Sequence, residues 1–389
     1  MSLVKNYEDE YGLHFTIKDV HVSYANAIRR TILSDIPTVV IRTETSEINT
    51  CKITANTTRF HNEIVKQRLS NIPIHVKGNI VERFIKSYRL VVNVKNESKH
   101  EIRWVTTDDF KIQEKTTGQF LEDAEMNKIF PRDTITNHPI DFLRLRPAIG
   151  NVDGEQIQLT ADFSVSTAKE NGMFNVVSKC SFQNVIDSEY KEDVWAVQLQ
   201  KMKDENMSNE EIEFERKNFQ FLDAQRCFKK DENGEPNEFD FVVKTVGVYT
   251  NQELVNYACE ILKNKFENLI KGIQSQIVPI HSTSDSRDIG YTSVTISSIE
   301  NSYDIILEHE DYTMGYLLEH YLYQMFYLDK TQENEMTYVG FKKYHPHDEY
   351  SVIRMAFADD TTAMLLIKQY LVKTCIEVCN DIEKIKKHF

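Results

Sequence analysis

Two adjacent arginines, Arg29 and Arg30, are the residues of this sequence best suited to specific binding. A guanidinium group stays charged at physiological pH and presents a planar fork of donors that fits a carboxylate. The spacing of apolar residues around the pair predicts an amphipathic helix that begins at Ser23 and ends before Pro37. Its apolar stripe consists of Ala25, Ile28, Ile32, Leu33 and Ile36.

Arg29 falls within that stripe, and Arg30 lies just beyond its edge, beside Asn26. A guanidinium among apolar side chains is costly unless an acceptor meets it. The acceptor can belong to another protein, or it can be a carboxylate of the same chain. In a third interpretation, Arg29 extends its charged end to solvent and Arg30 is an ordinary surface residue.

Other residues with catalytic potential lack the partners that catalysis requires. Asp359 and Asp360 would hold Mg²⁺ only within a larger carboxylate cluster, and they are interpreted as the cap of the helix that follows. His345 and His347 flank Pro346, a pattern more typical of a turn than of a metal pair. The sequence has no P-loop, no G-x-S-x-G and no H-E-x-x-H. We therefore expect no catalytic residue and interpret the chain as a non-enzyme.

The charge of the chain argues against direct contact with nucleic acid. Its 389 residues carry a net charge of −14, whereas duplex binding depends on cations that displace counterions. The six cysteines are scattered without a CxxC pair, which favours reduced, mostly buried thiols and predicts no metal and no cofactor. No apolar run approaches the roughly 20 residues of a membrane span, and the amino terminus lacks an apolar signal core, so no membrane association is expected.

Alternating strand and helix patterns predict a mixed α+β fold. A strand over 11–18, the arginine-bearing helix and a strand after Pro37 should form a sheet with the helix on one face. Further strands are expected over 88–94, 101–105, 142–147, 156–163, 174–182 and 238–248, with 142–147 and 156–163 paired around the turn at 150–154. A capped helix, followed by a turn into a strand at Pro73, is expected over 57–74. Further helices are expected over 250–276 with a capping box at Thr250 and Glu253, and up to residue 221 in the charged segment 187–235 with a capping box at Ser208 and Glu211. That segment is interpreted as a solvated helical surface, with docking of another protein as the alternative.

The second half repeats this plan after a polar segment around Pro279 that is typical of a linker. Strands are expected over 302–308, 336–344 and 350–357, and helices over 313–328 and 361–387.

Residues 26–37 read N-A-I-R-R-T-I-L-S-D-I-P and resemble the motif N-A-L-R-R-x-L-L-S-E-I-P of the RNA polymerase alpha subunit family. This family includes the bacterial alpha subunit, its D-type counterpart in archaea and the third-largest subunit of eukaryotic RNA polymerase II. A second block keeps Asn56, Thr57, Glu63, Ile64, Arg68, Leu69, Ile72 and Pro73 of a family segment. Leu145, Arg146 and Pro147 match a stretch of the inserted domain, where several relatives bind zinc or an iron–sulfur cluster; the absence of a cysteine cluster here predicts no metal.

The second half is similar to the small partner of that family, which is the L-type subunit in archaea and the eleventh subunit of RNA polymerase II. Glu310, Asp311, Thr313, Gly315, Leu317 and Leu318 match the signature E-D-H-T-L-G-N-L-L. A later F-x-G-Y-x-x-x-H-P block is matched by Val339, Gly340, Phe341, His345 and Pro346.

The resemblance implies two alpha-type dimerisation units, each an antiparallel sheet with helices, paired about a pseudo-twofold axis. The first unit would span 1–47 and 228–277, with a mostly β inserted domain over 48–227; a linker would span 278–300 and the second unit 301–389. The implied internal pairing interface consists of Ile28, Ile32, Leu262, Leu269, Leu317, Leu318, Leu371 and Val378. The implied large-subunit interface consists of Asn26, Arg29, Arg30, Glu63, Arg68 and Pro73.

The implied function is a non-catalytic assembly platform of a multisubunit DNA-dependent RNA polymerase. It would dock the second-largest and largest subunits and small assembly subunits, as one copy per polymerase, an internal pseudo-heterodimer without direct nucleic-acid contact. The alternative is a free-standing dimerisation or adaptor protein with the same fold; a hydrolase in the inserted domain has no residue trio to support it. Joined subunits resemble those of some large cytoplasmic DNA viruses. This implies a cytoplasmic location, in the viral factory with the virion as an option, or the nucleus if the chain is cellular.

Overall fold

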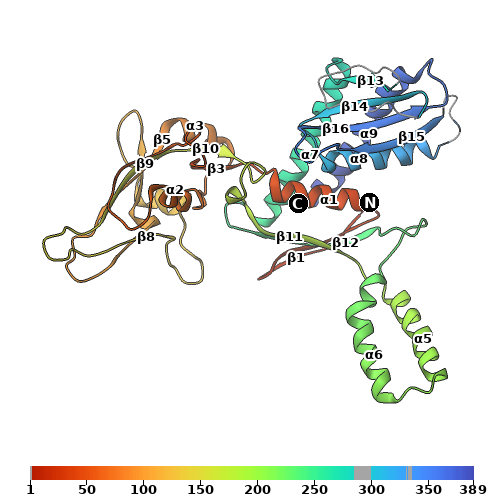
Figure 1. Cartoon of the computed structure of the whole chain (residues 1–389), viewed down its shortest axis with the longest axis horizontal. Coiled ribbons are helices and arrows are strands. Elements are labelled where there is room, and N and C mark those ends of the chain that lie inside the picture. Colours follow the sequence, from red (N-terminus) through yellow and green to blue (C-terminus); the bar gives the residue numbers. More distant parts are fainter. Residues whose placement is uncertain (1, 284–298, 330, 332–334) are drawn as a thin grey trace. The chain divides into compact units, whose positions relative to one another are not determined.

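The computed structural model describes residues 2–283, 299–329, 331 and 335–389. Their contacts define two compact units. Unit 1 comprises Met1–Ile32, Lys179–Val243 and Val255–Phe389, and unit 2 comprises Leu33–Ser178 and Lys244–Leu254. Both contain helices and antiparallel strand pairs (Figure 1), which confirms the predicted α+β class. Most of the linker predicted over 278–300 lies outside the described residues.

The first sheet of unit 1 joins strands that are distant in sequence. Its order is β1-β2-β12-β11, formed by Ser2–Asp9, Gly12–Lys18, Glu238–Thr245 and Val177–Asn184. Alternation along β2 buries Leu13, Phe15 and Ile17. Phe15 stacks on Phe241 of β12 with ring centroids 4.9 Å apart.

The strand after Pro37 does not join this sheet, so that part of the prediction was wrong. It is β3, only Thr38–Val40, and it pairs with β10, Ser164–Ser166, in unit 2. Instead, β2 pairs with β12 on one side and with β1 on the other. The sequence did not indicate β1, because polar and apolar residues do not alternate along it. Local pattern identified the strand after Pro37, but pairing depends on a partner more than a hundred residues away.

Two helices complete the first half of unit 1. The helix α1, Val22–Ser34, forms around the arginine pair as predicted. The helix α7, Asn251–Gln274, begins at the predicted capping box. There the Thr250 amide donates to Glu253 Oε2 at 2.8 Å, and the Glu253 amide donates to Thr250 Oγ1 at 3.2 Å.

The carboxyl-terminal part of unit 1 has a second antiparallel sheet of order β13-β14-β16-β15. The strands are Ile280–Ser282, Ser302–Glu308, Tyr350–Phe357 and Met336–Lys342. The helix α8, Tyr312–Leu322, begins at Asp311, which accepts the Thr313 amide. It continues as one π-helical turn, η5, Tyr323–Tyr327, rather than as the regular helix predicted to residue 328.

The long helix α9, Ala363–Lys386, closes the chain. The predicted capping role of Asp359 and Asp360 was wrong, because Thr362 occupies the cap position and makes no side-chain capping bond. Asp359 instead accepts the Thr361 amide in the preceding turn, and Asp360 accepts the Tyr303 hydroxyl. The turn predicted at Pro346 is confirmed.

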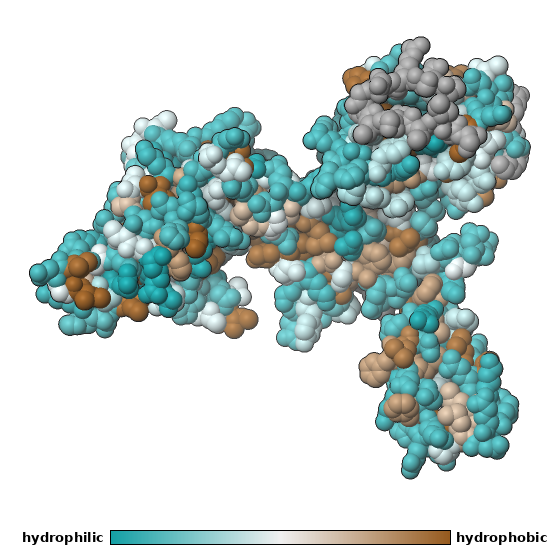
Figure 2. Space-filling model, viewed as in Figure 1, coloured by the Kyte–Doolittle hydropathy of each residue, from teal (hydrophilic) through white to brown (hydrophobic). Residues whose placement is uncertain are grey.

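The charged segment of unit 1 folds into α5, Ser188–Asp204, and α6, Asn209–Leu222, followed by the short turn η4, Ala224–Arg226. The capping box at Ser208 and Glu211 is formed as predicted. The helices share a small core of Trp195, Phe219, Ala224 and Cys227. Hydrophobic patches lie among hydrophilic ones on this hairpin (Figure 2).

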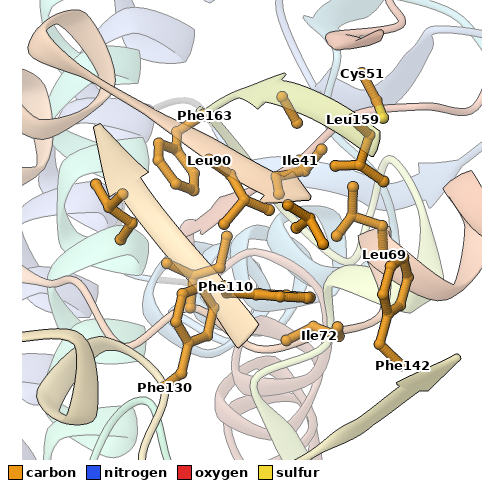
Figure 3. Close-up of a cluster of buried hydrophobic side chains, with 14 of the residues drawn as sticks. Ile41, Cys51, Leu69, Ile72, Leu90, Phe110, Phe130, Phe142, Leu159 and Phe163 are labelled. Atoms are coloured by element: carbon orange, nitrogen blue, oxygen red, sulfur yellow. The ribbon is translucent and has the colours of Figure 1, made fainter. Parts of the chain in front are cut away.

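Unit 2 has one continuous hydrophobic core (Figure 3), in which Leu90, Phe110, Phe142 and Leu159 meet. Its main sheet has the order β4-β9-β5-β7, formed by Cys51–Asn56, Gln156–Asp162, Tyr88–Lys95 and Phe110–Glu114. A second ladder joins β6, Arg103–Thr106, to β8, Asp141–Leu145. The short helices are α2, α3 and α4, Asn62–Ser70, Val81–Ser87 and Asp123–Ile129, with 3₁₀ turns η1, η2 and η3 at Gly78–Ile80, Thr107–Asp109 and Gly172–Phe174.

Two predictions for unit 2 were wrong in detail. The strands β8 and β9 do not pair around residues 150–154, because β8 pairs with β6 and β9 lies between β4 and β5. The helix predicted within 57–74 begins only at Asn62, and residues 73–77 form no strand after it. Its expected first turn is an Asx turn instead, in which Asn56 Oδ1 accepts the amide and hydroxyl of Thr58.

Candidate functional site

Residues from three other helices of unit 1 influence the environment of Tyr24. Tyr24 lies on α1 and is 2% exposed. Burial raises its pKa well above the ordinary value, with further contributions from Cys259 of α7, Tyr321 of α8, and Asp381 and Cys379 of α9. Tyr24 of α1 therefore lies within electrostatic reach of residues from α7, α8 and α9, and we call this region the helix junction.

Arg30 connects α1 to the start of α8. Its Nη2 donates to Asp311 Oδ2 at 2.7 Å, and its Nε donates to Thr313 Oγ1 at 2.8 Å. Asp311 also caps α8 through the Thr313 amide at 2.9 Å. One carboxylate thus fixes the helix end and binds the arginine, and a charge-assisted pair of this kind is stronger than a neutral hydrogen bond. From the sequence, Arg30 was predicted to lie in the interface with a large polymerase subunit. In the structure, Arg30 has an acceptor, Asp311, in its own chain.

Ion pairs join α7 to α9. Lys263 binds Glu383 at 2.6 Å, and Glu260 binds Lys386 at 2.8 Å. The higher number on α7 pairs with the lower number on α9, so the two helices run antiparallel where they meet. A third pair, Lys265 with Glu310 at 3.2 Å, joins α7 to the segment before α8. Nothing in the sequence predicted these pairs, because each side chain taken alone resembles an ordinary surface charge.

The residues predicted for internal pairing are mostly buried in unit 1. Leu269 is half-buried. At most 1% of the surface is exposed for Ile28, Ile32, Leu262, Leu317, Leu318, Leu371 and Val378. The same apolar contacts extend to the chain end, where the Phe389 ring packs edge-on against Phe15 at a centroid distance of 4.9 Å.

Arg29 has a different environment from Arg30. Its Nε and Nη2 donate to Asn26 Oδ1 at 3.1 and 2.8 Å, within the same helix. Both residues are half-buried. The acceptor that Arg29 was predicted to need is therefore the amide oxygen of Asn26. Because this oxygen is neutral, the contact does not compensate the guanidinium with a full negative charge.

The other residues predicted for a large-subunit interface lie in unit 2. Glu63 and Arg68 of α2 are exposed, and Pro73 is half-buried. Arg68 Nε donates to the Phe142 carbonyl at 2.6 Å, which ties α2 to β8. Arg68 therefore has a structural contact besides any role in binding.

Two histidines that the sequence did not single out stack across the helix junction. His21, just before α1, lies parallel to His320 of α8 with ring centroids 3.9 Å apart. Burial, together with the neighbouring His21, lowers the pKa of His320 to about 4. Burial also lowers the pKa of His21, against the opposing charges of Glu235 and Asp231. Both rings are therefore neutral at physiological pH.

The described residues offer no site for a metal. Across residues 2–283, 299–329, 331 and 335–389, no three His, Cys, Asp or Glu side chains are grouped to hold an ion. All six cysteines are free, and five of them are buried. No helix in this part of the chain is both long and apolar enough to cross a membrane.

Comparison with known proteins identifies the family to which this chain belongs. The family model of the RNA polymerase Rpb3/Rpb11 dimerisation domain matches residues 14–266. The chain is 24% identical over 282 residues to DNA-directed RNA polymerase subunit Rpo3 of Pyrococcus furiosus, covering 68% of this chain and 94% of that protein. It is 32% identical over 81 residues to DNA-directed RNA polymerases IV and V subunit 3B of Arabidopsis thaliana, covering 21% of this chain and 23% of that protein. The family match spans α1 and most of α7, two of the helices at the junction, and the chain belongs to the RNA polymerase Rpb3/Rpb11 dimerisation domain family.

Proposed function

We propose that this chain is a non-catalytic subunit of a multisubunit DNA-directed RNA polymerase and serves as its assembly platform. Family membership supports this role, as does similarity to an Rpo3 subunit over 94% of its length. The described residues contain no catalytic carboxylate cluster, so polymerisation would be carried out by the large subunits that the platform holds together.

We further propose that residues 301–389 are a built-in dimerisation partner, joined to the first half about a pseudo-twofold axis. The family match ends at residue 266, and the element order beyond it repeats the first half: strand, short helix, strands, long helix. The observation that carries the proposal is the bond from Arg30 of α1 to Asp311 at the start of α8. Covalent linkage would make this pairing intramolecular, at high effective concentration.

The pairing can be tested by a protease site inserted between residues 284 and 298. The uncut chain should have the mass of a monomer, 45.5 kDa, and the two fragments should stay together after cleavage. The α7–α9 ion pairs and the buried apolar seam are the physical reason. Fragments that separate at micromolar concentration, or an uncut homodimer, would contradict internal pairing.

We propose that Arg29 binds the second-largest subunit. The other residues proposed for this interface are Asn26 on α1 and Glu63, Arg68 and Pro73 of unit 2. Arg29 is half-buried and donates to an amide oxygen, so a carboxylate from outside would be a stronger acceptor. Loss of a buried interfacial charge pair typically costs about 2–5 kcal/mol of binding. The Arg29→Ala variant should therefore fold normally and lose the large subunit.

Affinity purification from the native source tests the polymerase role. The wild-type chain should co-purify with the largest and second-largest catalytic subunits and small assembly subunits, at one copy each. Recovery of the folded chain without them would favour a free-standing adaptor. The two joined subunits resemble those of some large cytoplasmic DNA viruses. We therefore also propose such a virus as the source and the cytoplasm as the location. Recovery of the chain from nuclei would contradict this location.

A further inference from the structure

A cavity of about 490 Å³ opens in unit 1 between the amino-terminal end of α1 and α8. Val22 and Asn26 line it from α1. Tyr316, Glu319 and His320 of α8 line the other side, and η5 adds Tyr323. The cavity is adjacent to the helix junction but is not filled by the contacts that hold the junction together. We call it the Glu319 cavity.

Helical spacing explains why these side chains share one wall. Residues three, four and seven positions apart lie on the same helix face, as Tyr316, Glu319 and Tyr323 do. The two tyrosines are 45% and 40% exposed, so their rings are available to a ligand. Tyr316 also packs against Phe341 at a centroid distance of 5.2 Å, which holds its ring in place.

Glu319 is a half-buried carboxylate without a cation. Its Oε1 accepts the Phe341 amide at 3.3 Å, and no lysine or arginine of the described residues forms an ion pair with it. Burial raises its pKa, and the Phe341 amide opposes that shift. His21 and His320 also line this cavity, but burial lowers the pKa of both, so they are neutral near pH 7 and do not compensate Glu319.

We propose that the Glu319 cavity receives a lysine or arginine side chain of a partner protein. The side chain would ion-pair with Glu319 while its charged head lies against Tyr316 and Tyr323. A cation over a phenol ring is attracted by the ring's quadrupole, and more strongly when both are desolvated. A partially buried charge in a cavity is also a typical marker of a functional site.

Charge complementarity decides between possible occupants. A carboxylate in the wall disfavours phosphate, nucleic acid and acidic lipids, because like charges repel. A purely apolar side chain would bury the Glu319 carboxylate without a cation, at a cost in desolvation. The proposal concerns any basic partner protein, so it does not depend on the polymerase role.

Methyl NMR of the full chain can test this, because Val22 and Val339 line the cavity and report on it directly. The probes are three capped pentapeptides in which lysine, arginine or norleucine is flanked by glycines. The lysine and arginine peptides should shift both methyl signals saturably, with dissociation constants roughly in the millimolar range. The norleucine peptide should bind at least tenfold more weakly. Buried Val352 of β16 serves as a fold reference.

A matched pair of variants isolates the carboxylate. Glu319→Gln should weaken lysine-peptide binding at least tenfold, without moving the Val352 signals. Glu349→Gln should have no effect, because the Glu349 side chain is 84% exposed and does not line the cavity. Equal binding of norleucine, retained binding by Glu319→Gln, or no shift in the wild type would overturn the proposal. Tighter binding of spermidine than of either peptide would indicate a free polyamine and would overturn the assignment to a protein side chain.

Discussion

The Phe341 ring of β15 lies directly against Gly315 of α8, so that a Cβ atom at residue 315 would overlap it. Tyr312 and Tyr316 pack on the same ring, with centroids 5.4 and 5.2 Å from it. Gly315 thus sets how closely α8 approaches β15, and with it the position of the wall that carries Glu319.

Replacement of Gly315 by alanine should destabilise the chain by about 1–3 kcal/mol, the usual range for overpacking a closed site. Tyr312 and Tyr316 both contact the ring, which limits its freedom to move away. The measurement is the free energy of unfolding in urea. The control is Gly172→Ala, where an added Cβ meets open space and little change is expected. Equal stability of the two variants would show that the ring is free to shift.

The bond between Arg30 and Asp311 should contribute measurably to stability. Their side chains are 35% and 27% exposed, so solvent screening is partial and a coupling of about 1 kcal/mol is expected. A double-mutant cycle with Arg30→Ala and Asp311→Asn, read by urea unfolding, gives this value. The exposed pair Lys86 and Glu82, 69% and 78% exposed, provides a reference that should lie near zero. A zero coupling for Arg30 and Asp311 would remove this bond as an argument for internal pairing.

The Tyr24 hydroxyl has no hydrogen-bond partner among the described residues. An unsatisfied buried hydroxyl costs free energy, so Tyr24→Phe should be neutral or stabilising by about 1 kcal/mol. Tyr321→Phe is the matched comparison, because that hydroxyl donates to Asp381 Oδ2 at 2.5 Å. Its loss should destabilise the chain by about 1–2 kcal/mol. Thermal unfolding that ranks the two variants in the opposite order would contradict this account.

The stacked histidines should make stability fall in acid. The folded pKa of His320, about 4, lies below its unfolded value, so the unfolded chain binds more protons between these values. Stability is therefore full above about pH 6.5 and decreases as the pH falls toward 4, by on the order of 1 kcal/mol between pH 7 and 5. The facing carboxylates Asp231 and Glu235 oppose the effect only in part.

His320→Phe keeps a ring on His21 but removes one titrating group, so its unfolding free energy should depend less on pH over this interval. Urea unfolding at pH 7 and pH 5 checks this. An unchanged pH dependence in His320→Phe would assign the acid sensitivity to other groups.

Local signals in the sequence were sufficient for many elements. The capping boxes at Ser208 and Thr250 correctly marked the starts of α6 and α7, because capping depends on residues only three positions apart. The apolar stripe correctly located α1, but it omitted Tyr24, Ala27 and Thr31, which are also buried. A stripe assumes one covered face, whereas α1 lies between the first sheet and the helices that meet it at the junction (Figure 1).

Long-range pairing was not predictable in the same way. The Arg30 acceptor lies 281 residues along the chain, and the charges of α7 and α9 acquire partners only when the two helices pack. Pairing of β3 with β10 likewise depends on strands that no local pattern connects. The sequence also could not predict that Glu319 is half-buried without a cation, because a single glutamate on an amphipathic helix is normally exposed to solvent.

The antiparallel contact of α7 with α9 has a consequence for how the chain is made. Roughly a hundred residues separate the end of α7 from the end of α9, and ribosomes add about 5–20 residues per second. The nascent chain therefore carries Cys259, Leu262 and Phe266, all buried in the finished protein, for several seconds before α9 can cover them. During that interval, the unfinished chain exposes apolar surface of the kind that makes folding intermediates prone to aggregation.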